Sequence, residues 1–256
     1  MAISQEQRND QEDDGGNAQF TQTHWSTIVE AGGPTSTEAR EALNRLCERY
    51  WHPLYAFLRR RGVDGHTAKD VTQGFFAHLF QQDFLRKVHR DKGRFRSFLL
   101  ASLTNFLKDE WRRENAQVRG GSAEIVSIDE AEAEERYSHL PRQDAEPSDT
   151  FDLSWAVTTV AEAKRKLRKE YAQKSDEKFY DLLQPHLTSK GEGGSYAALT
   201  QALGKDENAV GVLLHRMRRR FGQLLREEIA QTVASRAEID EEIRYLLQVW
   251  AGGTTT

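Results

Sequence analysis

A run of arginines in the last quarter of the chain has the residue types and the spacing that suit phosphate binding. Arg216, Arg218, Arg219 and Arg220 follow a short helical pattern and a turn at Gly204-Lys205-Asp206. Guanidinium groups pair well with phosphate oxygens, and a helix after such a turn can place its N-terminal residues in the major groove of DNA. The pattern favours a helix-turn-helix that binds DNA, although a solvated basic helix in an ordinary bundle would carry the same residues.

A second group of cations lies beside aromatic residues in the first half of the chain. The basic segment 86–94 is followed at once by Phe95 and by a helical pattern whose polar arc contains Asn105. Aromatic rings suit stacking on unpaired bases, while cations neutralise the backbone of a single strand. We expect Phe98 and Phe106 to fill the core, and we expect the basic segment to bind nucleic acid.

The chain offers little for catalysis or for binding a metal or a cofactor. Its eight histidines are scattered, with neither a His-Glu-x-x-His motif nor a Cys/His cluster. The glycine-rich segment 191–194 follows a proline-terminated helical pattern and lacks the Lys-Ser/Thr pair of a phosphate-binding loop. Without a convergent acid, base or nucleophile, we expect a protein that is not an enzyme and that uses no cofactor and no metal.

Charge is segregated along the chain, although the formal net charge is only −4. Residues 86–119 carry ten Lys or Arg against four acidic residues, and residues 205–226 carry six against two. Between them, residues 124–149 carry nine acidic residues against two arginines. Because local fields decide which surface attracts phosphate, the two basic segments fit nucleic-acid binding despite the acidic total.

Composition predicts a soluble, cytoplasmic, all-α protein. Hydrophobic residues make up 38% of the chain and charged residues 30%, and no stretch shows the period-two alternation of a strand. The single cysteine, Cys47, stands at an apolar helical position, which predicts a buried thiol. The longest apolar run, residues 98–103, is far too short to span a bilayer, so we expect no membrane insertion.

Helical periodicity predicts three helices in the first half of the chain. Apolar residues recur every three or four positions from 43 to 58, where we expect Pro53 to break or restart the helix, and Gly62 closes the run. A second helix is predicted from a cap at Asp64 to about residue 82. The third, from about residue 94 to 114, has the most regular periodicity.

In the second half of the chain, the pattern predicts a helix that starts at Phe151 and continues towards Pro185. A short helix is then predicted over 196–203, with Ser195 as its cap. After the turn, a longer helix runs from about residue 207 past 225. A capping box at 235–238 precedes a last, amphipathic helix. Its apolar residues are Ile239, Ile243, Leu246, Leu247 and Trp250.

Composition shifts divide the chain into five parts. Residues 1–19 lack periodicity and predict a disordered tail, and residues 116–150 are acidic with Gly and Pro, which predicts a linker. Helical domains are expected on either side of that linker, at 20–115 and 151–233. The C-terminal helix and tail occupy 234–256.

Four motifs in this order resemble those of a known family. Residues 68–76, Ala-Lys-Asp-Val-Thr-Gln-Gly-Phe-Phe, come first, followed by residues 93–99, Gly-Arg-Phe-Arg-Ser-Phe-Leu, with Asn105, Asp109, Arg112 and Arg113 after them. Residues 195–220 supply the helix-turn-helix pattern, and residues 226–233 form the fourth motif. Together they resemble sigma-70 family RNA polymerase sigma factors, in the two-domain extracytoplasmic-function form with a C-terminal helical extension.

The resemblance implies a transcription initiation factor of two helical domains, region 2 and region 4, with core RNA polymerase and promoter DNA as partners. An anti-sigma factor or another regulatory protein is a further partner that such proteins can have. The acidic linker would thread a basic RNA-exit path on the polymerase. Gly74, Gly211 and Leu213 depart from the family pattern, where charged residues are usual.

The resemblance also implies the roles of particular residues. Polymerase binding falls to residues of the first motif, namely Asp70, Gln73 and Phe76. Recognition and opening of the minus-ten element fall to Arg94, Arg96, Asn105, Lys108, Arg112 and Arg113. Recognition of the minus-thirty-five element falls to Asp206, Glu207, Asn208, His215, Arg216, Arg218 and Arg219.

Two other functions remain open from the residues alone. A helix-turn-helix regulator that never binds polymerase would need the same arginines. A helical interaction protein would need neither DNA nor polymerase, and its basic segments would be solvated surface.

Overall fold

The computed structural model describes residues 37–80, 94–114, 129–141, 145–174, 176–187, 197–233 and 236–253. Every regular element in these ranges is a helix, which confirms the expected all-α class. The predicted tail at 1–19 and residues 86–93 of the basic segment lie outside the described residues. Within the described ranges, no helix is both long and apolar enough to cross a membrane, and no group of side chains could hold a metal ion.

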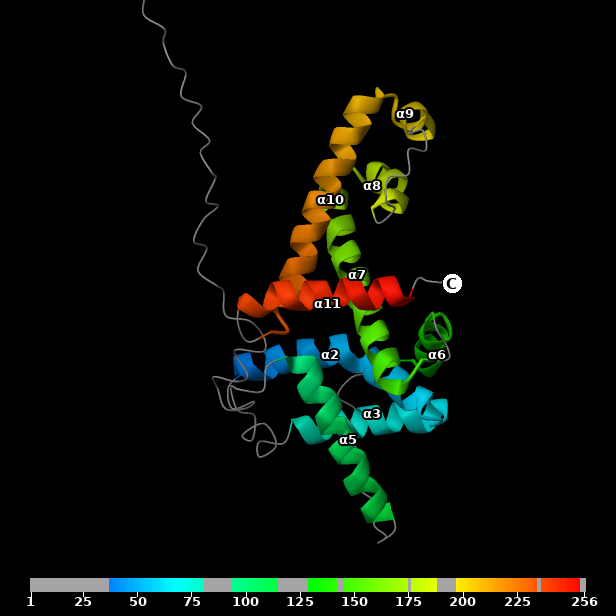
Figure 1. Cartoon of the computed structure of the whole chain (residues 1–256), viewed down its shortest axis with the longest axis vertical. Helices are drawn as coiled ribbons and strands as arrows, with labels where there is room; N and C mark the ends of the chain where they lie inside the picture. The colour runs from blue at the N-terminus through cyan, green and yellow to red at the C-terminus, as the bar shows by residue number, and fades with distance from the viewer. Residues whose placement is uncertain are drawn as a thin grey trace, which may run out of the picture.

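The first three helices form the lower group in Figure 1: α2 (Thr37–Arg60), α3 (Gly65–Leu79) and α5 (Phe95–Glu114). Helix α2 continues through Pro53, so the expected break there is wrong. A proline inside a helix costs about 3 kcal/mol. The fully buried side chains of Trp51 and Leu54 flank it, and each contributes about 1.5–3 kcal/mol by leaving water. Tertiary packing therefore outweighs the local penalty.

The turn between α2 and α3 follows the local signals in the sequence. Gly62 adopts a φ of +85°, which residues with a Cβ rarely take, and the Val63 amide donates back to the Leu58 carbonyl at 3.2 Å. The Asp64 carboxylate then accepts a hydrogen bond of 3.0 Å from the Thr67 amide, which caps α3. The predicted stop and the predicted cap are both confirmed.

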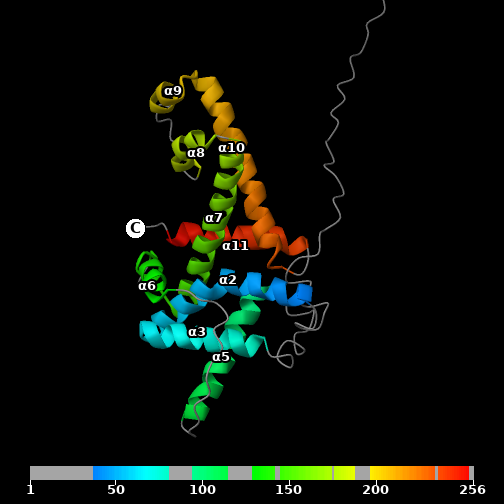
Figure 2. The same ribbon diagram turned by 180° about the vertical axis from the view of Figure 1, so that it is seen from behind.

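Helix α7 (Pro147–Gln173) is the longest described helix and connects the two ends of the molecule. Figures 1 and 2 show it running from the lower group past α11 (Ala237–Gly253) to the upper helices. It packs along α2 in the lower group, and along α10 (Glu207–Ala230) and α8 (Glu177–Leu183) in the upper group. The two halves of the chain are thus joined through a shared helix.

The segment that we expected to be a linker contains α6 (Glu130–Ser138) and the first turn of α7. Helix α6 packs on α2 and α3. Its Glu134 carboxylate accepts hydrogen bonds from Arg59 Nε at 2.8 Å and from the Tyr55 hydroxyl at 2.7 Å, both on α2. At least one acidic side chain of this segment, Glu134, therefore pairs with a cation of the same protein.

The upper group begins with α8, which is followed by the short 3-10 helix η2 (Gln184–His186). Helix α9 (Ala197–Leu203) follows, and a three-residue turn leads into α10. Gly204 in the turn has a φ of +60°, and Asp206 caps α10 by accepting a 2.8 Å hydrogen bond from the Ala209 amide.

Helix α11 crosses between the lower group and α10 (Figures 1 and 2). Ile239 and Leu246 are buried against the neighbouring helices, as expected, but Leu247 is 55% exposed and does not belong to the buried face. A continuous set of buried apolar side chains runs through α2, α5, α7, α10 and α11. Cys47 lies within it as a free thiol, and burial raises its pKa. One core therefore spans both halves of the chain.

Candidate nucleic-acid interface

Helix α3 carries the first set of predicted residues. Asp70 is exposed and Gln73 is half-buried, so both reach the surface of the helix. The Asp70 carboxylate lies 3.7 Å from Nε2 of His66, and Nδ1 of the same ring lies 3.7 Å from Glu130 on α6. Phe76 is fully buried. In this structure it supports α3 from the core and is not placed to contact a partner.

The C-terminal half of α5 extends past α3 in Figures 1 and 2. Asn105 and Lys108 are both exposed there. A groove of about 490 Å³ runs beside Asn105 and is bounded by Ser97, Ala101 and Thr104 of α5 and by the first turns of α7. Arg112 and Arg113 belong to the last turns of α5, but their side chains lie outside the described residues. Arg96 and Leu100 of α5 also line the groove, which is open to solvent.

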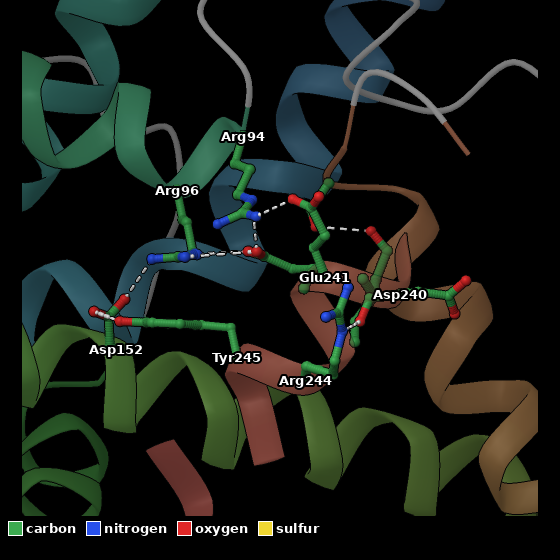
Figure 3. A network of polar contacts seen from close by, with 10 residues as sticks. Arg94, Arg96, Asp152, Asp240, Glu241, Arg244 and Tyr245 are labelled. Atoms are coloured by element: carbon green, nitrogen blue, oxygen red, sulfur yellow. Dashed lines mark hydrogen bonds and ion pairs between the residues drawn. The ribbon is translucent and has the colours of Figure 1, made fainter. Parts of the chain in front are cut away.

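The other end of α5 has a different environment, which Figure 3 shows from close by. Nε of Arg94 lies 2.9 Å from the Glu242 carboxylate, and its Nη2 lies 2.9 Å from Glu241. Arg96 is 8% exposed. It donates to Glu242 and, at 2.9 Å, to Asp152 of α7. The two arginines therefore bind carboxylates of α7 and α11, and the small exposed part of Arg96 borders the groove beside Asn105.

The ionisation of this cluster is fixed by its surroundings. Burial raises the pKa of Asp152, against the hydrogen bond from Tyr245 and the charge of Arg96, which lower it. Burial and the hydrogen bond to Asp152 raise the pKa of Tyr245 to about 12. Burial works against the charge of Arg96, but Glu242 and Asp152 keep its pKa above the usual value. At neutral pH Tyr245 therefore remains a donor and Arg96 remains a cation.

The start of α10 is open to solvent. Asp206, Glu207 and Asn208 are all exposed, at the end of the helix whose amides point outwards. Further along, Val210, Leu214 and Met217 are buried. The predicted DNA-binding residues His215, Arg216 and Arg219 are exposed.

Two arginines in the same run have partners inside the protein. Arg218 donates to the His186 carbonyl of η2 through Nη2 at 2.8 Å and Nε at 3.2 Å. Arg220 binds the carboxylate of Glu170 on α7, with Nη2 at 2.6 Å. Both side chains therefore fasten α10 to its neighbours, whereas Arg216 and Arg219 face solvent.

Buried acidic residues were the part of this region that sequence reasoning missed. Glu242 stands between Ile239 and Leu246 on the buried side of α11, and its side chain is 1% exposed. Glu228 is fully buried beside Ile229 of α10, where it binds Arg49 of α2 and Lys166 of α7. An acidic residue in the apolar register of an amphipathic helix is the signal that could have found both.

The comparisons with known proteins bear on the first half of the chain. Residues 46–117 match the family model described as Sigma-70 region 2. No curated protein and no solved structure matches the chain. The matched segment contains α3 and α5 and most of α2, which are the helices that carry Asp70, Gln73, Asn105 and Lys108. The chain therefore contains a segment that is similar to Sigma-70 region 2.

Proposed function

We propose that this protein is a transcription initiation factor that recruits core RNA polymerase and directs it to a promoter with two recognition elements. In this proposal residues 20–115 act as region 2 and residues 151–233 as region 4. The single observation that carries the proposal is the match of residues 46–117 to Sigma-70 region 2. The exposure of side chains on α3, α5 and α10 supports the remaining assignments.

Helix α3 is the proposed polymerase-binding element. Asp70 and Gln73 reach its surface one turn apart, while Ala68, Phe75, Phe76 and Leu79 are buried and fix the helix to α2 and α5. A rigid helix that presents two polar side chains suits a polar contact with another protein, because little side-chain entropy is lost on binding.

The distal half of α5 is the proposed site for the unpaired strand of the minus-ten element. Asn105 can both donate to and accept from a base edge, and Lys108 carries a charge for the backbone. The groove beside Asn105 offers space next to these side chains. This arrangement supports binding of a strand whose bases are turned away from the duplex.

Helix α10 is the proposed reader of the minus-thirty-five element. Its exposed first turn would enter the major groove, so base preference would rest mainly on Asn208 and its neighbours. Arg216 and Arg219 lie further from that turn and would bind phosphates, which contribute affinity without sequence preference.

Co-elution with core RNA polymerase tests the proposal directly. The wild-type protein is expected to co-elute with core enzyme in gel filtration. The double variant Asp70→Ala/Gln73→Ala should not, because both proposed contacts are removed, while its helical circular dichroism stays unchanged. A matched control is Asp181→Ala/Gln201→Ala, which removes the same residue types from exposed positions outside the matched segment.

The outcome also separates the proposal from its rivals. A wild-type protein that binds DNA but never co-elutes with core enzyme would be a regulator independent of polymerase. A protein that binds neither partner at any salt concentration would be a helical interaction protein. Run-off transcription by the reconstituted holoenzyme, on DNA from upstream of its own gene, then tests promoter recognition.

A further inference from the structure

Two arginines of the segment proposed to read the minus-ten element bind carboxylates in this structure. Arg94 and Arg96 lie at the start of α5, and α11 places Glu241 and Glu242 against them. The guanidinium groups are thus already paired with anionic oxygens, which are also the groups that a DNA phosphate would offer. At the other end of the same helix, Asn105 and Lys108 remain exposed.

We infer that α11 is an intramolecular competitor for nucleic acid: Glu241 and Glu242 take the place of DNA phosphates on Arg94 and Arg96, and α11 must leave before this end of α5 can bind DNA. The inference rests on the proposed function, because it assumes that α5 meets the promoter. It adds a closed form of the free protein, in which α11 pairs with Arg94 and Arg96 at the start of α5.

The closed form is held by several independent contacts. The Phe95 amide at the start of α5 donates to the Thr232 carbonyl, in the segment between α10 and α11, at 3.1 Å. The Tyr245 hydroxyl donates to Asp152 of α7. The Arg96 guanidinium lies 4.0 Å from the centre of the Tyr245 ring, a cation–π contact. A backbone hydrogen bond, a buried ion pair and a cation–π contact therefore act together to hold α11 and the segment before it against α5 and α7.

The edge of the same cluster is open, which allows exchange of one anion for another. The side chain of Arg94 is 28% exposed and that of Glu241 is 57% exposed, whereas Glu242 is 1% exposed. A phosphate can therefore reach Arg94 first, while Arg96, which borders the groove beside Asn105, loses its Glu242 partner only when α11 moves. Because the incoming phosphate replaces a carboxylate, Arg96 does not remain buried without a counter-ion, which would be strongly unfavourable.

The first test compares two variants of the full chain in binding to a single-stranded DNA of about 12 nucleotides. Glu242→Gln removes the charge that pairs with both arginines. Asp240→Asn removes the same charge two residues away, where Asp240 binds only the exposed Arg226 at 2.7 Å among the ion pairs of the described residues. Circular dichroism verifies that both variants are folded.

In Glu242→Gln each arginine loses one carboxylate, while Arg94 keeps Glu241 and Arg96 keeps Asp152, so the variant adds up to two phosphate contacts. Each contact steepens the salt dependence of single-strand binding by about 0.7 in log K against log salt, so the slope of Glu242→Gln should steepen by up to about 1.4. The same slope predicts an affinity up to about 25-fold higher at 0.1 M salt and little difference at 1 M. Asp240→Asn should keep the affinity of the wild-type protein within about twofold.

Hydrogen exchange of the wild-type protein gives a second test that needs no variant. The amides of α11 should be protected in the free protein and should exchange faster when saturating single-stranded DNA is added. Protection of α11 that stays unchanged with DNA bound would overturn the inference, as would an unchanged affinity and slope for Glu242→Gln.

The experiments distinguish failure of the proposed function from failure of the competition by α11. If the protein co-elutes with core polymerase and α11 stays protected with DNA bound, the competition is wrong and the initiation factor stands. If neither the wild-type protein nor Glu242→Gln ever binds core polymerase, while DNA still exposes α11, the initiation factor is wrong and the competition stands.

Discussion

Replacing Arg49 by methionine should destabilise the junction between the two halves of the protein. The Arg49 guanidinium binds the Glu228 carboxylate and donates to the Glu228 backbone carbonyl at 2.9 Å. The Glu228 side chain is fully buried, and Lys166 of α7 is its other cation. With Arg49→Met, Glu228 keeps only Lys166, whose side chain is 39% exposed and thus partly hydrated.

The expected magnitude follows from the burial of Glu228. Breaking a buried ion pair on one side typically costs about 3–5 kcal/mol, and the remaining lysine places this variant near 3 kcal/mol. That corresponds to a fall in Tm of roughly 6–12 °C for a protein of this size. Replacing both partners, in Arg49→Met/Glu228→Met, should recover most of the loss, because an apolar pair leaves no buried charge.

Urea unfolding followed by circular dichroism measures these differences. Arg45→Met is the matched control, because Arg45 lies one turn earlier on α2, is 62% exposed, and is 3.9 Å from Glu41. Its effect should stay within about 0.5 kcal/mol. The reasoning fails if Arg49→Met costs less than about 1 kcal/mol, or if the double variant is no more stable than the single one.

Three further predictions concern the backbone, DNA binding and pH. Gly204→Ala should destabilise the protein by about 1 kcal/mol because its φ is +60°, whereas Gly211→Ala, in a helix with open space around it, should stabilise it by about as much in the same unfolding assay. Arg219→Ala should reduce the salt slope of duplex binding by about one at unchanged Tm, whereas Arg218→Ala should lower the Tm, because it loses the bonds to the His186 carbonyl. Burial and the charge of Arg136 lower the pKa of His52 to about 4, so the neutral ring favours the folded state above about pH 6.5 and this contribution is lost as the pH falls towards 4. His52→Leu should therefore lose less Tm than the wild-type protein between pH 7 and 4.5.

Local signals were sufficient to predict most helix boundaries. Gly62 and Asp64 act through their own backbone and side chain within a few residues, so the sequence alone predicts the turn that they form. Pro53 was misread because its penalty is local, while the burial of Trp51 that outweighs it comes from distant helices. The apolar register likewise predicted most of the buried face of α11 but not the exposure of Leu247.

The candidate site was harder to predict, because its residues meet across long separations in sequence. The types of Arg94 and Arg96 are consistent with phosphate binding, and nothing nearby in the chain shows that carboxylates almost 150 residues later reach them. Arg218 and Arg219 are neighbours of the same type, yet one bonds to a carbonyl of η2 and the other faces solvent. The two arginines differ in role only because α10 packs on its neighbouring helices with Arg218 facing η2 and Arg219 facing solvent.

The pairing of α2 with α7 has a consequence for synthesis on the ribosome. Helix α2 ends at Arg60 and α7 ends at Gln173, so about 110 residues are translated between them. At about 5–20 residues per second, the nascent chain exposes the aromatic face of α2 for roughly 6–23 s before its partner helix is complete. During this interval Trp51 and Tyr50 have no α7 to cover them, and a chaperone that binds apolar segments would have its best target there.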